Sequence, residues 1–262
     1  ALCLPTMARA QEVCTTNNWS SVVGATELSV GLAGADNRKY SGPCGLRVNL
    51  AGTDSYVQDD SPLNEGIFNV RFYFYFNDVA EEVVMFQALD GSGVPVIEAY
   101  YDPAGAIPGI YVDFSTGVAT ESVPATGLGT GWHSLEIQWS ASGNPNVRLQ
   151  QGDTSTSQTW SNPLDMSGVT IESARLGAIG SVPTSGSIDF DDYDSRREGT
   201  PGRLVVGDAN GDDAVNAQDF VQVINEILGS DVGEGQSDCT EDGGINAQDF
   251  VCVINIILGT SG

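Results

Sequence analysis

The apolar residues of this chain follow one spacing before residue 200 and a different one after residue 216. Alternation is strict in residues 70–76, where four apolar residues fall on one face and Arg71, Tyr73 and Tyr75 fall on the other. Such alternation predicts a half-buried β-strand. Turn-forming segments rich in Gly, Pro, Asp and Asn, such as residues 90–93 and 142–145, separate similar runs. We therefore expect a mostly β fold, a two-sheet jelly-roll sandwich.

After residue 216 the apolar spacing becomes that of an amphipathic helix. The first helical stripe follows i, i+3, i+4, i+7, i+8 spacing and contains Phe220, Val223, Ile224, Ile227 and Leu228. The same stripe recurs in residues 250–258, and a glycine follows each copy at Gly229 and Gly259, where a helix commonly ends. Two such short helices cannot bury their stripes alone, so we expect them to pack against each other.

The two helical segments belong to an internal repeat. Residues 216–229 recur as residues 246–259 at an offset of 30, and the two copies are identical at twelve of fourteen positions. Repetition this close predicts two copies of one structural unit.

Oxygen-bearing side chains stand at alternating positions before each helix. Calcium takes six to eight oxygen ligands, and a twelve-residue loop can supply them. In residues 208–219 the expected ligands are Asp208, Asn210, Asp212, the carbonyl of Ala214, Asn216 and Asp219. In residues 238–249 they are Asp238, Thr240, Asp242, the carbonyl of Gly244, Asn246 and Asp249. We expect two calcium ions, and folding of this region coupled to their binding.

Two positions of these loops depart from the usual pattern. Asp213 stands at the sixth place, where glycine is usual, although Asp tolerates left-handed backbone better than most residues. Thr240 is a neutral ligand at the third place of the second loop. We therefore expect the second calcium site to be the weaker one.

The string Asp-x-Asn-x-Asp-x-x-Val-Asn-x-x-Asp of residues 208–219 resembles the loop of a dockerin repeat, and the resemblance covers residues 207–260. It implies docking onto a cohesin-like module or another extracellular protein module. The contact would run through the tenth and eleventh places of both loops, namely Ala217, Gln218, Ala247 and Gln248. Near-identical repeats imply a surface that docks in either of two orientations. The basic pair that many dockerins carry further along the helix is absent, because Ile224 and Asn225 stand there.

The β region also carries a resemblance. Residues 131–139, Gly-Trp-His-Ser-Leu-Glu-Ile-Gln-Trp, and the strand-like residues 146–152 resemble laminin-G-like, concanavalin-A-like jelly rolls. The resemblance spans roughly residues 40–197. It implies a fold that hosts lectins, adhesion modules, hydrolases and lyases alike, so it does not decide the chemistry.

The β region lacks the carboxylate pair of a retaining glycosidase. Glu136 has no acidic neighbour two residues away, and His133 belongs to the Trp-His strand, which favours a structural role. We therefore expect no catalytic residues. A polysaccharide-degrading hydrolase or lyase that carries a dockerin stays an alternative, as does an extracellular structural subunit that assembles with copies of itself.

Two further candidate sites lie in the β region. Four tyrosines are candidates for a platform that stacks on sugar rings: Tyr73, Tyr75, Tyr100 and Tyr101. Four aspartates near one strand end are candidates for a third calcium site: Asp189, Asp191, Asp192 and Asp194. In each case ordinary packing or solvation is the competing explanation.

The charge of the chain argues against anionic partners. The sequence has 35 Asp and Glu against 10 Lys and Arg, a formal net charge of −25. Such a chain repels phosphate backbones and anionic lipid, so we expect neither nucleic acid nor membrane insertion. No apolar run approaches the ~18–20 residues that a membrane helix needs.

The N-terminal segment and the cysteines indicate secretion. Residues 1–10 end in Ala8-Arg9-Ala10, which is typical of the tail of a signal peptide. Beyond it, Cys14 and Cys44 lie in the β region and Cys239 and Cys252 lie in the second repeat. Two cysteines in each region suggest one disulfide in each, as in an oxidising compartment.

These observations predict a secreted or cell-surface protein with four parts: a signal-peptide tail at residues 1–10, a jelly-roll domain at 11–197, a linker at 198–206 and a dockerin-like domain at 207–262. We expect a non-catalytic protein that docks through its calcium-binding region. The jelly roll is a candidate for polysaccharide binding.

Overall fold

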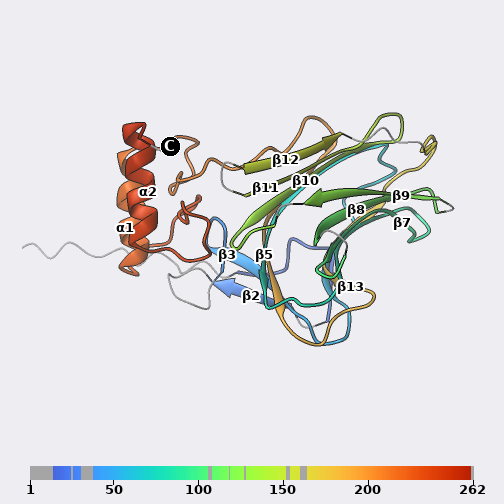
Figure 1. Ribbon diagram of the computed structural model, residues 1–262, viewed down its shortest axis with the longest axis horizontal. Helices are drawn as coiled ribbons and strands as arrows, with labels where there is room; N and C mark the ends of the chain where they lie inside the picture. Colours follow the sequence, from blue (N-terminus) through green and yellow to red (C-terminus); the bar gives the residue numbers. More distant parts are fainter. Residues whose placement is uncertain are drawn as a thin grey trace, which may run out of the picture.

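The computed structural model describes residues 14–24, 26–30, 38–105, 108–117, 119–126, 128–151, 154–159 and 164–260. In this part of the chain two antiparallel sheets face each other, and two helices follow at one end (Figure 1). The expected mostly β sandwich with a small C-terminal α region is confirmed. The signal-peptide segment, residues 1–10, lies outside the described residues. Neither helix of the described part is long and apolar enough to cross a bilayer.

Each sheet has seven strands. Sheet A contains, in spatial order, β1 (Ser21–Val23), β4 (Ser55–Asp59), β13 (Ser173–Ile179), β6 (Val83–Leu89), β7 (Pro95–Asp102), β8 (Gly109–Ser115) and β9 (Thr120–Thr126). Sheet B contains, in spatial order, β12 (Thr154–Thr159), β11 (Asn146–Gln151), β10 (His133–Ser140), β5 (Ile67–Asn77), β14 (Ser187–Arg196), β3 (Cys44–Asn49) and β2 (Thr26–Val30).

The core lies between the two sheets, and the alternation in β5 places it there. Phe72 and Phe74 of β5 are fully buried, and the Phe72 ring lies 5.4 Å from that of Phe86 in sheet A. On the strand beside β5, Leu135 stands opposite Phe72 and points into the same core. Arg71 falls on the other face of β5, outside the core. A period of two thus separates the core from the outer face of sheet B, as the sequence predicts.

The helices are α1 (Ala217–Ile227) and α2 (Ala247–Leu258). Each begins after an asparagine N-cap within a capping box, and Gly229 and Gly259 take left-handed φ values of 66° and 65°. The helices pack through their first turns, where the Phe220 and Phe250 rings lie 4.6 Å apart.

The last turn of each helix differs from the sequence prediction. Leu228 is 73% exposed and Leu258 is 67% exposed, so these two residues are not part of the packed stripe. The helices are too few to enclose their full apolar stripes. The helices meet within the small core of this region, where Val223 and Val253 of their second turns are buried and Ile256 of α2 packs against them.

The segment that joins the sandwich to the helical region lies along the outer face of sheet B. The carbonyl of Gly199 accepts a hydrogen bond from Asn69 Nδ2 at 2.7 Å, and the N–H of Leu204 donates to Tyr73 Oη at 2.9 Å. Although its composition is that of a linker, this segment is held by side chains of β5. The helical region is therefore fixed at one end of the sandwich (Figure 1).

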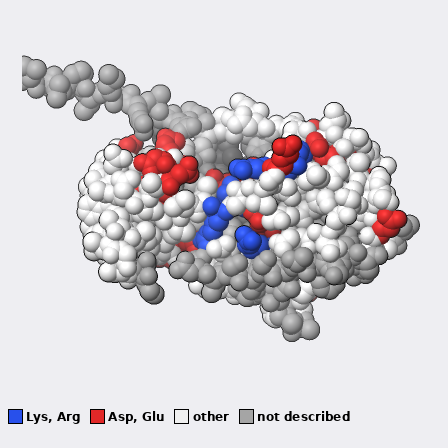
Figure 2. Space-filling view, turned by 90° about the horizontal axis from the view of Figure 1, so that it is seen from above, with Lys and Arg blue, Asp and Glu red and all other residues white. Residues whose placement is uncertain are grey.

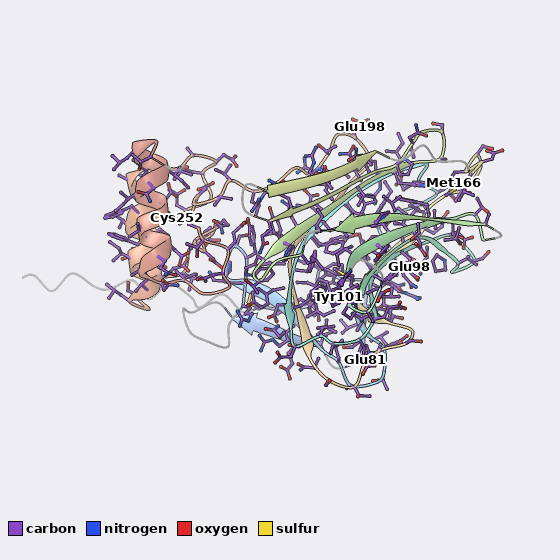
Figure 3. All side chains as sticks on the ribbon, viewed as in Figure 1. Glu81, Glu98, Tyr101, Met166, Glu198 and Cys252 are labelled. Carbon is purple, nitrogen blue, oxygen red and sulfur yellow. A yellow bond between two sulfur atoms is a disulfide. The ribbon has the colours of Figure 1, made fainter. Side chains whose placement is uncertain are left out.

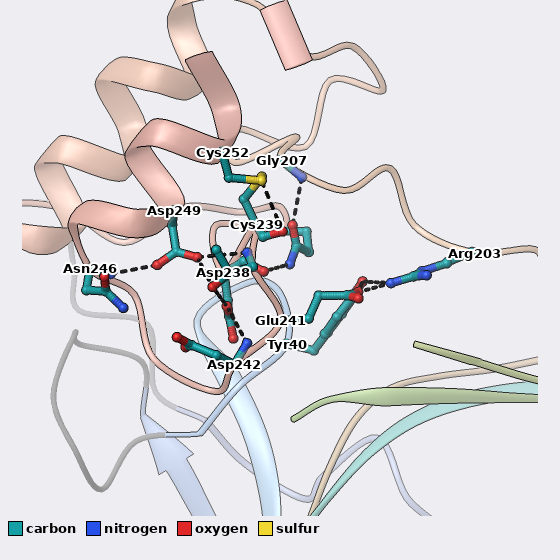
Figure 4. Close-up of a disulfide and its surroundings, with 12 residues drawn as sticks. Tyr40, Arg203, Gly207, Asp238, Cys239, Glu241, Asp242, Asn246, Asp249 and Cys252 are labelled. Carbon is teal, nitrogen blue, oxygen red and sulfur yellow. Dashed lines mark hydrogen bonds and ion pairs between the residues drawn. A yellow bond between two sulfur atoms is a disulfide. The ribbon is translucent and has the colours of Figure 1, made fainter. Parts of the chain in front are cut away.

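Two disulfides form as the sequence predicts. Cys14 is joined to Cys44 in the β region, and Cys239 is joined to Cys252 in the second repeat. The second bond ties the start of the second loop to the middle of α2 (Figure 4).

Candidate metal centre and docking surface

The first repeat folds its loop around two aspartates. Asp208, at the first place, accepts hydrogen bonds of 2.8–3.1 Å from three main-chain N–H groups of the same loop, those of Gly211, Asp212 and Asp213. Asp219, at the twelfth place, accepts from Asn210 N at 3.0 Å and Asn216 N at 2.7 Å. The same carboxylate therefore caps α1 and holds the third and ninth places of the loop.

The second repeat reproduces this arrangement (Figure 4). Asp238 accepts from Asp242 N at 3.1 Å and Gly243 N at 2.7 Å. Asp249 accepts from Thr240 N at 2.9 Å and from Asn246 N at 2.8 Å. Because both loops close in the same way, the spacing of their oxygens is set by the backbone and not by the third-place residue.

Two buried carboxyl groups in each loop have no basic partner. Asp208, Asp219, Asp238 and Asp249 are all buried. In the part of the chain that the structure describes, none of the four forms an ion pair with Lys or Arg. Buried carboxylates without a partner are costly, because burial removes their hydration.

The pKa values of the two first-place aspartates, Asp208 and Asp238, show that cost. Burial, together with the charges of Asp249 and Asp242, raises the pKa of Asp238 to about 8. Burial also raises the pKa of Asp208, with a contribution from Asp219. A divalent cation between the carboxylates would favour their charged forms and reverse these shifts.

The residues present fit calcium. In the described residues, no group of three or more His, Cys, Asp or Glu side chains is arranged to hold a metal ion. Each loop therefore offers two buried carboxylates and needs neutral oxygens to complete a shell, such as the side chain of Asn210 or Thr240 and a main-chain carbonyl. A hard oxygen-seeking cation matches that donor set, whereas a metal that prefers His or Cys does not.

The remaining predicted ligands lie at the open side of each loop. Asp212 is exposed, and its carboxylate accepts from Asn210 Nδ2 at 3.1 Å. The carbonyls of Ala214 and Gly244 accept from the amides of Asn216 and Asn246 at 3.3 and 3.1 Å.

The two helices share an exposed surface that we call the helix face. It includes the four residues that the resemblance assigns to partner contact, and all four are exposed. It also includes four large apolar side chains that are exposed to solvent. Its members are Ala217, Gln218, Val221, Leu228, Ala247, Gln248, Val251 and Leu258. The helical spacing predicted Leu228 and Leu258 in the packed stripes, so their exposure is a departure from the prediction, whereas Val221 and Val251 lie outside those stripes.

The four tyrosines do not form one platform. Tyr73 is 1% exposed and stacks on Tyr40 at 3.6 Å, while the guanidinium of Arg38 lies 4.1 Å above the Tyr75 ring. Tyr101 points into the sandwich and stacks on Phe76 at 4.3 Å (Figure 3). Tyr100 alone lies on the outer face of sheet A, because neighbouring residues of β7 point to opposite faces. The prediction that these four residues form a shared platform for sugar rings is therefore wrong.

The four aspartates of β14 are also accounted for without a metal. Asp189 receives Arg47 Nε at 2.7 Å, and Asp194 pairs with Arg196 at 2.7 Å. Asp191 accepts from the main-chain N–H groups of Tyr40, Ser41 and Asp192. A bulge between Asp191 and Asp194 turns these side chains in different directions. The third calcium site proposed from their spacing is therefore not supported.

His133 is buried in sheet B. Its Nε2 accepts from Gly129 N at 3.2 Å and its ring stacks on Phe74 at 5.4 Å. Burial lowers its pKa to about 4, so the ring is neutral at pH 7. This environment agrees with the structural role expected for His133.

A row of polar residues crosses the outer face of sheet A. Five successive register pairs join six strands, so that the side chains of Gln58, Arg175, Gln87, Glu98, Asp113 and Ser122 stand side by side. Three neighbouring pairs of this cross-strand row are joined by side-chain hydrogen bonds: Arg175 donates to Gln58 at 2.7 Å, Gln87 to Glu98 at 2.6 Å and Ser122 to Asp113 at 2.5 Å. Beside the row, the rings of Tyr100 and Tyr111 stack at 5.5 Å. Sequence reasoning missed the row, because its members are far apart in the chain.

Comparison with known families and structures bears on each half of the chain separately. Residues 206–258 match the dockerin type I domain. A search of the curated proteins found no match. Among solved structures, the cellulose induced protein Cip1 is 14% identical and has a TM-score of 0.51, over 72% of this chain and 96% of that one.

Two enzymes also resemble the chain more distantly. The endo-β-1,4-glucuronan lyase from the fungus Trichoderma reesei is 13% identical, with a TM-score of 0.47, over 68% of this chain and 91% of its own. The alginate lyase AlyC3 is 8% identical, with a TM-score of 0.42, over 58% of this chain and 74% of its own. At these identities the likeness concerns the fold of the sandwich and not its chemistry.

The two halves can therefore be assigned at different levels. The sandwich is of the jelly-roll type, and its fold is similar to that of the cellulose induced protein Cip1. The repeated loops, their capped helices and the family match agree on the C-terminal region. Residues 206–258 are a dockerin type I domain.

Proposed function

We propose that this chain is a non-catalytic extracellular interaction protein whose dockerin domain binds two calcium ions and docks onto a protein partner. Dockerin type I domains bind calcium and dock onto cohesin modules, and they are typical of extracellular and cell-surface proteins. The observation that carries the proposal is the set of four buried aspartates, two in each loop, without a basic partner. Calcium would neutralise them and close the loops.

The proposal divides the chain by role. It assigns residues 11–197 to the jelly-roll domain, residues 198–206 to the connection and residues 207–262 to the docking domain. Calcium in each loop would hold the N-terminal end of the helix that follows it. The helix face would then present two similar apolar strips to the partner, in a fixed geometry that needs little ordering on binding.

Calcium titration of the full chain by calorimetry tests the metal sites. We expect two ions per chain, and one after Asp208→Ala. The matched control is Glu234→Gln, which removes an exposed negative charge of the same domain outside both loops, and should leave two. An unchanged stoichiometry in Asp208→Ala would contradict the ligand assignment.

The docking partner can be sought with a panel of cohesin modules. We expect capture that depends on calcium and disappears in EDTA. Size-exclusion chromatography of the chain alone, with and without calcium, separates this proposal from self-assembly. Growth of large species in calcium without any partner would favour the structural-subunit alternative.

The cross-strand row favours a second function, glycan binding by the jelly roll. Six strands at about 4.8 Å spacing make the row roughly 24 Å long, enough for several sugar units. Carboxylates and amides can hydrogen-bond sugar hydroxyls, and the stacked pair Tyr100 and Tyr111 offers aromatic surface beside them. Because the chain has a net charge of −25 and would repel an anionic ligand, we propose a neutral polysaccharide.

Affinity electrophoresis in gels that contain neutral polysaccharides tests this second function. We expect retardation that is weakened by Glu98→Ala and Tyr100→Ala and unaffected by Glu81→Ala, an exposed residue outside the row. The same panel should be assayed for new reducing ends and unsaturated sugars. Either product would overturn the non-catalytic proposal in favour of a hydrolase or a lyase.

A further inference from the structure

The dockerin domain has no positive charge of its own. Residues 207–262 contain eleven Asp and Glu and no Lys, Arg or His. Basic side chains from outside the domain contact it instead. Lys39 forms an ion pair with Glu226, Arg203 forms one with Glu241, and Arg38 donates a hydrogen bond to the second loop. Figure 2 shows Lys and Arg side chains gathered across the middle of the molecule, whereas the helical end at left shows none.

Several contacts from outside the dockerin domain converge on the second loop, and Figure 4 shows those of Tyr40 and Arg203 with Glu241. Trp132 N donates to the carbonyl of Glu241 at 2.9 Å, and Tyr40 Oη donates to Glu241 Oε1 at 2.5 Å. Arg38 Nη1 donates to the carbonyl of Gly243 at 3.2 Å. Together with the Arg203 ion pair, the residues that hold the loop form what we call the seat: Arg38, Tyr40, Trp132 and Arg203.

The seat holds the backbone between expected ligands. Glu241 and Gly243 occupy the fourth and sixth places of the loop, and the third, fifth and seventh places are the expected ligands. In the first loop the equivalent residues are Gly211 and Asp213, and both are exposed. The two loops share their internal hydrogen bonds but differ in what supports them from outside.

At these two places the backbone conformation is the same in both loops, but the residue types differ. The fourth place is left-handed in both loops, with φ of 75° at Gly211 and 58° at Glu241. Left-handed backbone suits glycine and strains glutamate, and such strain persists where surrounding contacts fix it. The sixth place is also left-handed in both loops, at Asp213 and Gly243.

Glycine at the sixth place of the second loop allows close contact with the sandwich. A Cβ atom on Gly243 would lie 2.4 Å from Arg38 Nη1 and 2.7 Å from the Tyr75 ring. Gly131 has the same role from the sandwich side, because a Cβ atom there would lie 2.3 Å from the Glu241 carbonyl oxygen. The two surfaces approach too closely for side chains at these points.

We infer that the second calcium site is built jointly by the dockerin domain and the sandwich. The seat pre-organises the second loop for calcium, and calcium in that loop tightens the seat, because coupling between two binding events is reciprocal. The first loop binds calcium without help from the sandwich. Thr240 alone predicts that the second site binds calcium more weakly than the first. In the intact chain we expect the seat to offset that loss of affinity. This inference rests on the proposed calcium binding.

Full-length variants with a single remaining site test the inference by calorimetry. In an Asp208→Ala background only the second site titrates, and Glu241→Gly should weaken it about tenfold. Glycine relieves the strained backbone and makes the fourth place identical to that of the first loop. In an Asp238→Ala background only the first site titrates, and Glu241→Gly should leave its affinity unchanged.

A second variant leaves the loop sequence untouched. Tyr40→Phe combined with Arg203→Met removes the side chains that hold Glu241, and should weaken the second site to a similar extent while the near-ultraviolet circular dichroism of the sandwich stays native. If both variants bind calcium at the second site within twofold of their parent, the inference is overturned. If the Asp208→Ala and Asp238→Ala parents bind no calcium at all, the proposed function itself fails.

Discussion

Lys39 Nζ lies 3.3 Å from Glu226 Oε2, and the two side chains are 3% and 1% exposed. The pair joins the sandwich to α1, and it explains one of the two positions at which residues 216–229 and 246–259 differ. Where the first copy has Glu226, the second has Ile256, which packs in the small core of the dockerin domain. Thus α1, which faces Lys39, carries the charged Glu226, and α2 carries the apolar Ile256 at the equivalent position.

Lys39→Met should destabilise the attachment of the dockerin domain. It leaves Glu226 buried and charged without its cation, which typically costs about 3–5 kcal/mol. Denaturant unfolding of the full chain in calcium should show this loss. Adding Glu226→Gln removes the charge but keeps an acceptor for Ser237 Oγ, which donates to Glu226 at 2.8 Å. The double variant should recover much of the stability, and failure to recover would mean that the charge is not the cause.

The second difference between the repeats is also structural. Cys252 in α2 bonds to Cys239 in the second loop, and the first repeat has Gln222 and Ala209 at these places. The variant Cys239→Ala with Cys252→Gln therefore gives the second repeat the residues of the first. Loss of a crosslink across 13 residues should lower the free energy of unfolding of the dockerin domain by about 2–3 kcal/mol.

Thermal unfolding with and without a reductant measures this effect. For the unfolding transition of the dockerin domain, the reductant should lower the Tm of the parent chain. It should leave the Tm of the double variant unchanged. Equal Tm values for the parent and the variant without reductant would show that the disulfide does not stabilise the domain.

Local patterns predicted the elements of this protein well. The alternation of β5, the helical stripes, the capping asparagines and the terminal glycines all depend on residues close in sequence. The two loops proposed to bind calcium are equally local, because the expected oxygen ligands of each lie within twelve consecutive residues. Their closure by Asp219 and Asp249 follows the spacing that the repeat displays.

Features formed between distant segments could not be read from the sequence. The cross-strand row needs the register of six strands, and Tyr73 is covered by Tyr40, which lies 33 positions earlier in the sequence. Likewise, the positive φ of Glu241 has a reason only once Arg203 and Tyr40 are seen against it. Spacing alone therefore indicated tyrosine and aspartate clusters whose members the fold turns in different directions.

The stability of the sandwich should depend on pH through His133. Its pKa is lowered to about 4 in the folded chain from an ordinary value of 6.5, so between these values the unfolded chain binds more protons. Stability is therefore fully present above pH 6.5 and is lost as the pH falls toward 4, by about 3 kcal/mol in total. His133→Gln retains an acceptor for Gly129 N and removes the titration. Denaturant midpoints measured from pH 7 to 4 should fall less steeply in the variant, and parallel curves would contradict the assignment.

The two strips of the helix face should be interchangeable in docking. Leu228 and Leu258 are exposed at equivalent places of the two helices, so a partner can approach in either of two related orientations. With a cohesin module that binds the parent chain, Leu228→Arg or Leu258→Arg alone closes one orientation and should weaken binding only about twofold, since one of two equivalent states remains. Both together should weaken it about a hundredfold or more, because a buried apolar anchor is replaced by a charge in every orientation. Biolayer interferometry in calcium distinguishes the outcomes. If one single substitution alone has the full effect, the attached sandwich blocks one of the two orientations.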